Sequence, residues 1–249
     1  MITNSRAEYI GAMIRGRILQ SALAQNILII GAGGHGSEVR AYIEDLPGAE
    51  ECVRLLGFID DNRAAGAWLQ TEILGGLPGL KELARSRSDI VFGYITAFGH
   101  NFLRHRIVRA IENFGLNNLR PWTLRHPTAH VGPEVQIGEG TLLAPNVIVT
   151  TRAVIGRHSI LNVRVSVSHD CLIGDFANIN PGAILCGRVS IGDGAYIGAG
   201  VIVRDGIRVG PGVTVGAGAV VIEDLPDNVT AVGVPARVIK TNTLKWLNT

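Results

Sequence analysis

The chain has 249 residues, 47% of them hydrophobic, so it is long enough for two domains that each bury a core. Its formal net charge is only +2, which argues against a broad nucleic-acid-binding surface. No run reaches the roughly 18 apolar residues of a membrane span, and arginines interrupt the first residues, so we expect a cytoplasmic protein with neither span nor signal peptide.

The N-terminal part begins with an ambiguous segment and continues into a glycine-rich turn. Residues 1–25 carry isoleucines at helical spacing, which fits either a docking helix or an extension ahead of the first domain. An apolar strand is predicted over 26–30. Gly31, Gly33 and Gly36 follow it as a G-x-G-x-x-G motif, and a helix opens at 37–39. Backbone N–H groups at such a helix start suit a phosphate or pyrophosphate, although the motif alone is weak.

Two further strands and two helices complete the predicted first domain. The strand over 55–59 ends in Asp60 and Asp61, which fits either acids for ribose hydroxyls or a solvated turn. Residues 73–76, a helix near 80–85 and a strand over 89–92 come next. In the helix over 102–114, Arg104, Arg106 and Arg109 are expected on a solvated face, although one could reach a phosphate. Residues 26–120 therefore predict a small β-α-β domain with a parallel sheet.

From Val131 to Pro226 the chain repeats every six residues through sixteen hexads without an insertion. The first position is always Val, Ile or Leu, and the fifth is almost always small or β-branched. Such a unit cannot bury its apolar side alone, so the copies must stack as a solenoid. We expect three hexads to close one coil of a triangular prism, with first positions inward and second-position glycines serving the corners. The unbroken count argues against a β-sandwich. Residues 121–240 are thus predicted to form the solenoid and its C-terminal cap, and 241–249 a tail.

One corner of the predicted solenoid carries groups that could do chemistry. His169 occupies a third position, so its ring should project outward, and Asp170 follows at once. A neutral imidazole suits general-base work near neutral pH, and the plain alternative is a surface histidine in a turn. Eighteen residues on, Gly187 leaves room for a thioester and exposes an N–H that could stabilise an oxyanion.

A metal site is not expected. A zinc site would need converging histidines, for which His130, His158 and His169 are the only candidates in the solenoid, and Gly174 stands where a second ligand would follow His169. The three cysteines show neither metal-ligand nor disulfide spacing.

Five motifs occur together in one order: Gly31-Ala-Gly-Gly-His-Gly36, Phe58-Ile-Asp-Asp61, Gly99-His-Asn101, Ser168-His-Asp-Cys-Leu-Ile-Gly-Asp175 and Gly233-Val-Pro-Ala236. With these motifs, residues 26 to 240 resemble the hexapeptide-repeat sugar acetyltransferases, which include sialic acid O-acetyltransferases and the bacillosamine and perosamine N-acetyltransferases. The resemblance implies an α/β Rossmann-like domain that holds a nucleotide sugar. It also implies a left-handed parallel β-helix that forms a homotrimer, with acetyl-CoA between neighbouring prisms.

Carried over by residue, the resemblance makes His169 the general base, Asp170 its carboxylate partner and Gly187 the N–H donor that faces the thioester. Ala199 and Ala217 match positions that line acetyl-CoA. Asn178 stands where many members carry a second histidine, so a coenzyme contact there should be weaker or differently arranged. The residues matching the nucleotide-sugar site are Gly33, Gly34, His35, Asp60, Asp61, Gly99 and Asn101.

The predicted reaction is acetyl transfer from acetyl-CoA to the amine of a nucleotide-linked 4-amino-4,6-dideoxy sugar, for surface glycan biosynthesis. The nearer alternative is O-acetylation of a sugar hydroxyl, as on sialic acid. The alternative from another class is a non-catalytic β-helix that only binds a nucleotide sugar or scaffolds a complex.

Overall fold

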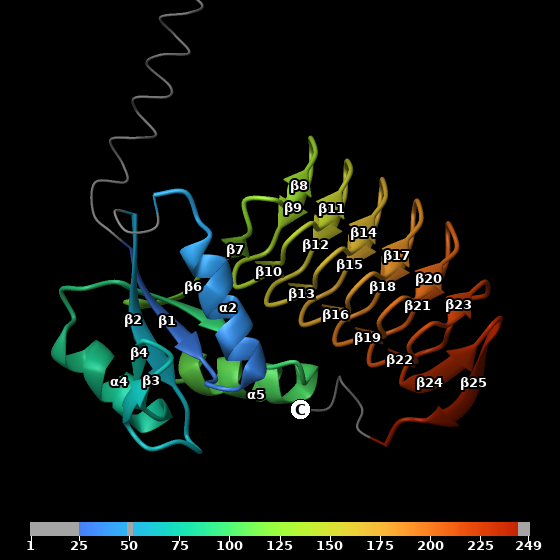
Figure 1. Ribbon diagram of the computed structural model, residues 1–249. Helices are drawn as coiled ribbons and strands as arrows, with labels where there is room; N and C mark the ends of the chain where they lie inside the picture. The colour runs from blue at the N-terminus through green and yellow to red at the C-terminus, as the bar shows by residue number, and fades with distance from the viewer. Residues whose placement is uncertain (1–24, 49–51, 244–249) are drawn as a thin grey trace, which may run out of the picture.

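The computed structural model describes residues 25–48 and 52–243 as an α/β domain followed by a β-helix (Figure 1). Apart from Gln25, the expected N-terminal extension lies outside the described residues, as does the tail beyond residue 243. No helix in the described part is long and apolar enough to cross a bilayer.

The N-terminal domain is a six-stranded sheet in the order β3-β4-β2-β1-β5-β6. Its parallel strands are β1 (Gln25–Ile30), β2 (Val53–Ile59), β4 (Thr71–Gly75), β5 (Phe92–Thr96) and β6 (Leu119–Pro121); β3 (Gly66–Trp68) pairs antiparallel with β4. The helices are α2 (Gly34–Glu44), α4 (Leu77–Ser86) and α5 (Asn101–Glu112). Strands β2 and β5 lie on either side of β1, so the strand order reverses at β1. Open α/β sheets bind their ligands in the crevice at such a reversal.

The strand predicted over 89–92 is wrong in its position. Strand β5 begins only at Phe92, which pairs with Asn26 of β1. Val91, just before it, is 52% exposed. Gly93 interrupts the apolar pattern of the true strand, yet the sheet requires it, because a Cβ there would lie 2.6 Å from Cδ1 of Ile27.

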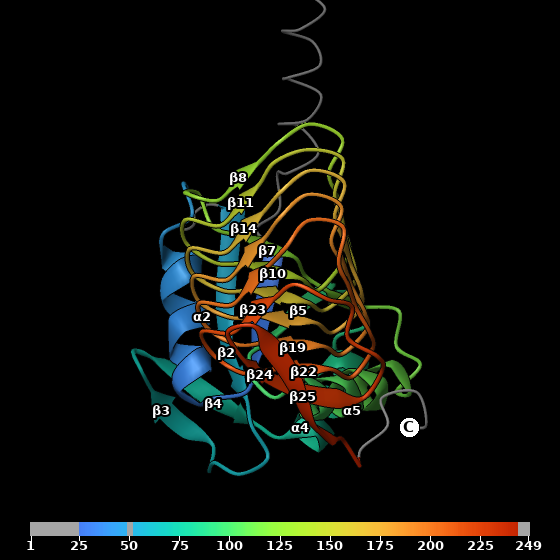
Figure 2. The ribbon, with the colours of Figure 1, turned by 90° about the vertical axis from the view of Figure 1, so that its right-hand side faces the viewer.

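Three parallel sheets of short strands form the sides of a left-handed triangular prism (Figure 2). The first sheet contains β7 (Leu124–Arg125), β10 (Leu142–Leu143), β13 (Ile160–Leu161), β16 (Asn178–Ile179), β19 (Tyr196–Ile197) and β22 (Thr214–Val215). The second contains β8 (His130–Val131), β11 (Ile148–Val149), β14 (Ser166–Val167), β17 (Ile184–Leu185), β20 (Ile202–Val203) and β23 (Val220–Val221). The third contains β9 (Gln136–Ile137), β12 (Val154–Ile155), β15 (Leu172–Ile173), β18 (Ser190–Ile191) and β21 (Arg208–Val209).

The core of the prism follows the hexad pattern. First-position side chains from Leu143 to Val221 are at most 3% exposed, and fifth-position side chains from Thr141 to Leu225 at most 4%. The second-position glycines lie at corners that leave no space for a Cβ, as expected, whereas the left-handed backbone falls at fourth positions, as at Asp170 with φ 59°. A second-position glycine such as Gly198 is needed because its Cβ would lie 2.6 Å from the backbone nitrogen of Ala217 in the next coil.

The N-terminal domain covers the first sheet of the prism. Leu142 and Ile160 point outward from that sheet but are buried in one apolar cluster with Ile27 and Val39 of the first domain. At the far end β24 (Val229–Gly233) extends the first sheet beyond β22, and β25 (Ala236–Thr241) folds back on it antiparallel. This hairpin is the predicted cap.

Candidate active site

His169 and Asp170 follow β14 at one edge of the prism, and both side chains reach solvent. The Nδ1 atom of His169 lies 2.7 Å from Oδ2 of Asp170. The two side chains are 45% and 36% exposed. The imidazole therefore has a carboxylate partner on one nitrogen and access to a ligand on the other.

Arg152, one coil earlier at the same edge, binds the Asp170 carboxylate as well. Its Nε donates to Oδ1 at 2.7 Å and its Nη2 to Oδ2 at 3.1 Å. The hydrogen bonds from Arg152 and from His169 lower the pKa of Asp170 to about 2. Asp170 is therefore ionised at neutral pH, and its Oδ2 accepts a hydrogen bond from the N–H at Nδ1 of His169. Neutral His169 then carries its lone pair on Nε2, the atom that can take a proton from a substrate.

Gly187 lies against the ring of His169 from the following coil. A Cβ on Gly187 would be 2.6 Å from Cε1 and 2.7 Å from Nε2 of His169, so only glycine leaves space for this ring. The neighbouring amides of Cys186 and Arg188 donate to Val203 and His169, whereas the Gly187 N–H donates to no group in the described part of the chain. The His169 ring and the backbone of Gly187, whose N–H has no acceptor among the described residues, therefore lie side by side.

The glycine-rich turn after β1 leads directly into the start of helix α2. Helix α2 begins at Gly34 with Gly33 as its N-cap, and no side chain caps it. A Cβ on Gly33 or Gly34 would meet no atom within 4 Å, so there is free space beside the backbone at the start of the helix. The Nδ1 atom of His35 lies 2.9 Å from Glu38, and its Nε2 is buried without a partner among the described residues. The turn suits a phosphate by its N–H groups and the helix dipole.

Asp60 and Asp61 both lie beside this turn, but each already binds a backbone amide. Asp60 accepts from the N–H of Ala32 at 2.8 Å, and Asp61 from that of Leu77 at 2.8 Å, at the start of α4. A cavity of about 280 Å³ adjoins both acids, and Arg106 contributes a cation to it. Its other lining residues are Ile30, Ile59, Asn62, Leu77, Phe98, Leu103, Ile107 and Ala110.

Gly99 and Asn101 lie at the junction of the two domains rather than inside that cavity. The Asn101 amide donates to the carbonyl of Gly194 in the β-helix. The carbonyl of Gly99 accepts from the amide of Asn178. Asn178 is 2% exposed, and its Oδ1 accepts from Arg104 at 2.5 Å. The structure therefore holds Asn178 at the domain junction and away from the His169 edge, and the coenzyme contact expected of it stays a prediction.

The expectation that Arg104 lies on a solvated face is wrong, because its side chain is 0% exposed. It donates to the carbonyls of His158 at 2.8 Å, Phe98 at 2.7 Å and Phe176 at 2.8 Å. Burial lowers the pKa of its guanidinium to about 9, which still leaves it charged at neutral pH. Arg104 therefore ties the loop after β5 to two coils of the β-helix.

Ala199 and Ala217 are exposed and stacked in adjacent coils, but they follow β19 and β22 of the first sheet. They therefore lie at a different edge from His169. The glycine-rich turn is also remote: it lies at the lower end of α2 in Figure 1, whereas the turns after β14 and β17 lie at the upper edge. One copy of the chain does not bring the predicted residues together.

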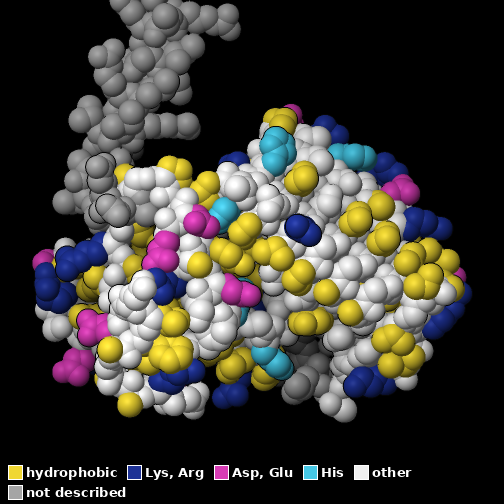
Figure 3. Space-filling view, viewed as in Figure 1, with side chains coloured by type: hydrophobic (Ala, Val, Ile, Leu, Met, Phe, Trp, Pro, Cys, Tyr) yellow, Lys and Arg dark blue, Asp and Glu magenta, His cyan; other side chains and the backbone are white. Residues whose placement is uncertain are grey.

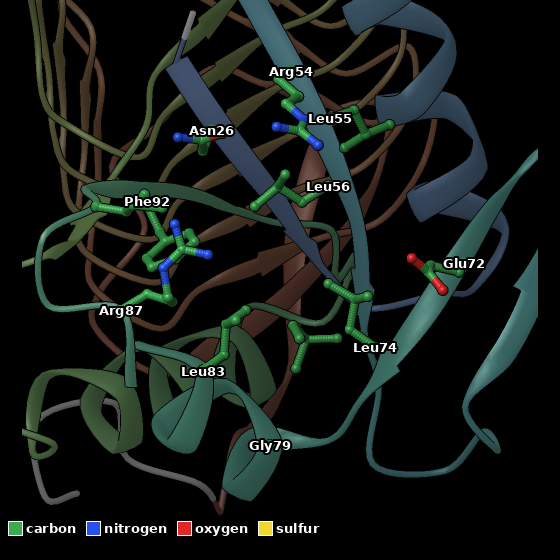
Figure 4. A pocket seen from close by; sticks show the side chains of 12 residues that line it. Asn26, Arg54, Leu55, Leu56, Glu72, Leu74, Gly79, Leu83, Arg87 and Phe92 are labelled. Atoms are coloured by element: carbon green, nitrogen blue, oxygen red, sulfur yellow. The ribbon is translucent and has the colours of Figure 1, made fainter. Parts of the chain in front are cut away.

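The cavity drawn in Figure 4 has a volume of about 460 Å³ and lies between the sheet and α4. Leucine side chains point into it, and Arg54, Arg87 and Glu72 stand around it. Neither the glycine-rich turn nor Asp60 lines it, so we do not assign it to the predicted chemistry. Among the described residues no group of three or more His, Cys, Asp or Glu could hold a metal ion.

Comparisons with known proteins bear on both domains. Residues 26–111 match the PglD N-terminal domain family, and residues 188–223 match the bacterial transferase hexapeptide (six repeats) family. UDP-N-acetylbacillosamine N-acetyltransferase of Bacillus subtilis (strain 168) is 36% identical over 119 residues, which cover 48% of this chain and 51% of that protein. The match thus spans about half the length of this curated relative.

Solved structures match over most of the chain. The acetyltransferase domain of PglB from Neisseria gonorrhoeae FA1090 is 32% identical with a TM-score of 0.75, covering 86% of this chain and 100% of that one. PerB from Caulobacter crescentus, in complex with CoA and GDP-perosamine, is 32% identical with a TM-score of 0.76, covering 88% and 99%. WeeI from Acinetobacter baumannii AYE is 30% identical with a TM-score of 0.72, covering 87% and 100%.

Proposed function

Because this chain belongs to the hexapeptide-repeat sugar N-acetyltransferases that include the PglB acetyltransferase domain and PerB, we propose that it acetylates the amine of a nucleotide-linked 4-amino-4,6-dideoxy sugar with acetyl-CoA. The observation that carries the proposal is the His169–Asp170 pair packed against the bare backbone of Gly187. Acetyl-CoA is the co-substrate, as in the solved complex of the PglB domain with that coenzyme.

The proposed reaction uses both nitrogens of His169. The substrate amine attacks the thioester carbonyl, and Nε2 takes a proton from the attacking nitrogen as the C–N bond forms. Asp170 stabilises the imidazolium through Nδ1, and the Gly187 N–H stabilises the oxyanion. The C–S bond then breaks, His169 returns the proton to the sulfur, and CoA leaves as the thiol. Holding both substrates in line supplies much of the acceleration.

The nucleotide part of the acceptor is proposed to occupy the crevice beside β1. Its phosphates would bind the amides of Gly33, Gly34 and His35 at the start of α2. Asp60 and Arg106 would contact the nucleoside in the adjoining cavity. Gly99 and Asn101 would act indirectly, since their bonds to the β-helix fix the loop after β5.

We also propose that the active site is completed between copies in a homotrimer. The first sheet of the prism is covered by the N-terminal domain, but the other two carry exposed apolar side chains, among them Ile148, Ile184 and Ile202 of the second sheet and Val154 and Leu172 of the third. Yellow side chains accordingly spread over the β-helix in Figure 3. Contact through these faces would bring the His169 edge of one copy toward the nucleotide crevice of another. Since acetyl-CoA is a cytoplasmic metabolite, we place the enzyme in the cytoplasm.

The test of this function measures CoA thiol release from acetyl-CoA across UDP-, GDP- and dTDP-linked 4-amino-4,6-dideoxy sugars, with free sialic acid alongside. Turnover on one nucleotide amino sugar is expected. Turnover on sialic acid alone would replace the proposal by O-acetylation. Binding of a nucleotide sugar without any binding of acetyl-CoA would indicate that the chain is a non-catalytic scaffold.

A further inference from the structure

Charged residues form a regular column along the edge that carries His169. Fourth positions of successive coils hold Glu134, Arg152, Asp170 and Arg188, eighteen residues apart, and all four have left-handed backbone with φ between 50° and 59°. Figure 3 shows basic, acidic and histidine side chains gathered along the upper edge of the β-helix. The signs alternate because a like charge in the next coil would repel across one strand spacing.

Asp170 lies between two arginines but binds only one of them. Arg152 makes two hydrogen bonds to its carboxylate. Arg188, equally one coil away, turns instead to Asp205, with Nη2 2.6 Å from Oδ2. The two arginines have similar exposure, 51% for Arg152 and 60% for Arg188. Asp170 therefore pairs with Arg152 and not with Arg188, and the Arg152–Asp170 pair is the one that contacts His169.

We propose that Arg152 is a positioning residue for the base: its guanidinium holds the Asp170 carboxylate against Nδ1 of His169 and offsets part of the carboxylate charge. This inference rests on the proposed function of His169. The fork geometry of an arginine fixes the plane of the carboxylate, so Oδ2 faces the imidazole and Nε2 stays directed away from it. By sharing the charge of Asp170, Arg152 also weakens the attraction of that carboxylate for a proton on the imidazole.

The charged groups around the His169 ring support the inference that Arg152 offsets part of the Asp170 charge. On its own corner the ring has Asp170, and the coils before it contribute Arg152 and Glu134. The coils after it contribute Arg188 and Asp205, which pair with each other and largely cancel. Behind the corner lies the buried Cys171 thiol, whose pKa burial raises, so it stays neutral. Removing Arg152 therefore leaves the Asp170 carboxylate as the main charge acting on His169.

The test measures the pKa of His169 directly, by NMR titration of imidazole-labelled trimer, with the His169 signal assigned from its loss in His169→Asn. Arg152→Gln should raise that pKa by about half a unit, a modest shift because the groups are exposed. Arg152→Lys keeps the charge and should return the value most of the way to wild type. The matched control is Arg188→Gln, which removes the same charge at the same distance along the column and should shift the pKa by much less.

Activity gives the second readout. The acid limb of kcat/KM against pH should move upward in Arg152→Gln by the shift seen in the titration, while the KM for acetyl-CoA changes little. An unchanged His169 pKa in Arg152→Gln, or an equal shift in Arg188→Gln, would overturn the proposal. Because the titration needs no turnover, a failure of the proposed acetyl transfer would be seen separately, as a normal titration shift in a protein without activity.

Discussion

Gly187 supports the ring of His169 from the next coil, with no room for a side chain between them. A Cβ on Gly187 would lie 2.6 Å from Cε1 of that ring, well inside van der Waals contact. No positive φ is required of Gly187, so its backbone conformation tolerates other residues and the requirement for glycine comes from His169 alone. Gly187 is therefore dispensable for the backbone of the β-helix but required by the position of the His169 ring.

The first prediction follows from that contact. In Gly187→Ala the methyl group displaces the imidazole, and kcat should fall on the order of 10²-fold, as expected for a misplacement of about 1 Å. Thermal unfolding should change little. The matched control is Gly79→Ala in α4, where a methyl group meets only an ordinary contact at 3.7 Å. Wild-type kcat in Gly187→Ala would show that the ring does not act from this position.

The second prediction concerns the anion site at the start of α2. Gly34 has free space around its Cα, so Gly34→Glu should fold normally while placing a carboxylate where the phosphates are proposed to bind. We expect the KM for the nucleotide sugar to rise at least about 10-fold through charge repulsion, with acetyl-CoA affinity unchanged. Gly34→Gln has the same size without the charge and should be affected less. Equal effects of Glu and Gln would indicate simple blocking rather than an anion site.

The third prediction tests whether two copies share one active site. With the nucleotide sugar well below its wild-type KM, His169→Ala and Gly34→Glu should each retain only a small part of the activity. When the two variants are unfolded, mixed and refolded together, hybrid trimers should regain part of the activity, because some crevices meet an intact His169 from a neighbouring copy. Recovery no greater than the sum of the separately refolded variants would contradict a shared site.

The fourth prediction concerns the pH dependence of stability. Burial, and then Arg157 and Arg104, lower the pKa of His158 to about 3 in the folded protein. An unfolded histidine titrates near 6.5, so between about pH 6.5 and pH 3 the unfolded state binds the extra proton and stability falls as the pH falls. His158→Phe preserves the stacking with Tyr94 and Phe176 and should remove up to about 1.4 kcal/mol per pH unit from this slope. Urea unfolding from pH 7.5 to pH 4 measures it, with the exposed His130→Gln as control. An unchanged slope in His158→Phe would contradict this assignment.

The fifth prediction concerns the junction of the domains. Arg104→Met leaves the carbonyls of His158, Phe98 and Phe176 buried without their donor. The free energy of unfolding should fall by about 3 kcal/mol. Arg109→Met on the exposed side of the same helix removes only a surface ion pair with Glu112 and should change it by less than about 0.5 kcal/mol. Equal effects of the two substitutions would show that Arg104 does not hold the junction.

The fold could be predicted closely because each hexad carries its own signal. The first and fifth positions, such as Val167 and Cys171, are inward wherever the count of six holds, so sixteen repeats reinforce one answer. The same periodicity aligns Arg152 with Asp170. This alignment is visible in the sequence and would have indicated Arg152 as a neighbour of Asp170, which the sequence analysis did not identify.

The junction of the domains could not be predicted in the same way. The pattern of α5 places Arg104 among polar neighbours, and only the docked β-helix buries it. For Asn178 the position within the hexad was known, but which face the N-terminal domain covers depends on contacts between segments distant in sequence. Local periodicity carries no information on such contacts.

The most direct test of the account is the turnover of His169→Asn with acetyl-CoA and the nucleotide amino sugar that the wild type uses. Asparagine keeps a polar group of similar size but cannot accept the proton. We predict that this variant binds both substrates with near wild-type affinity while kcat falls at least about 10²-fold. Near wild-type kcat in a correctly folded His169→Asn would contradict the central claim that this histidine is the base.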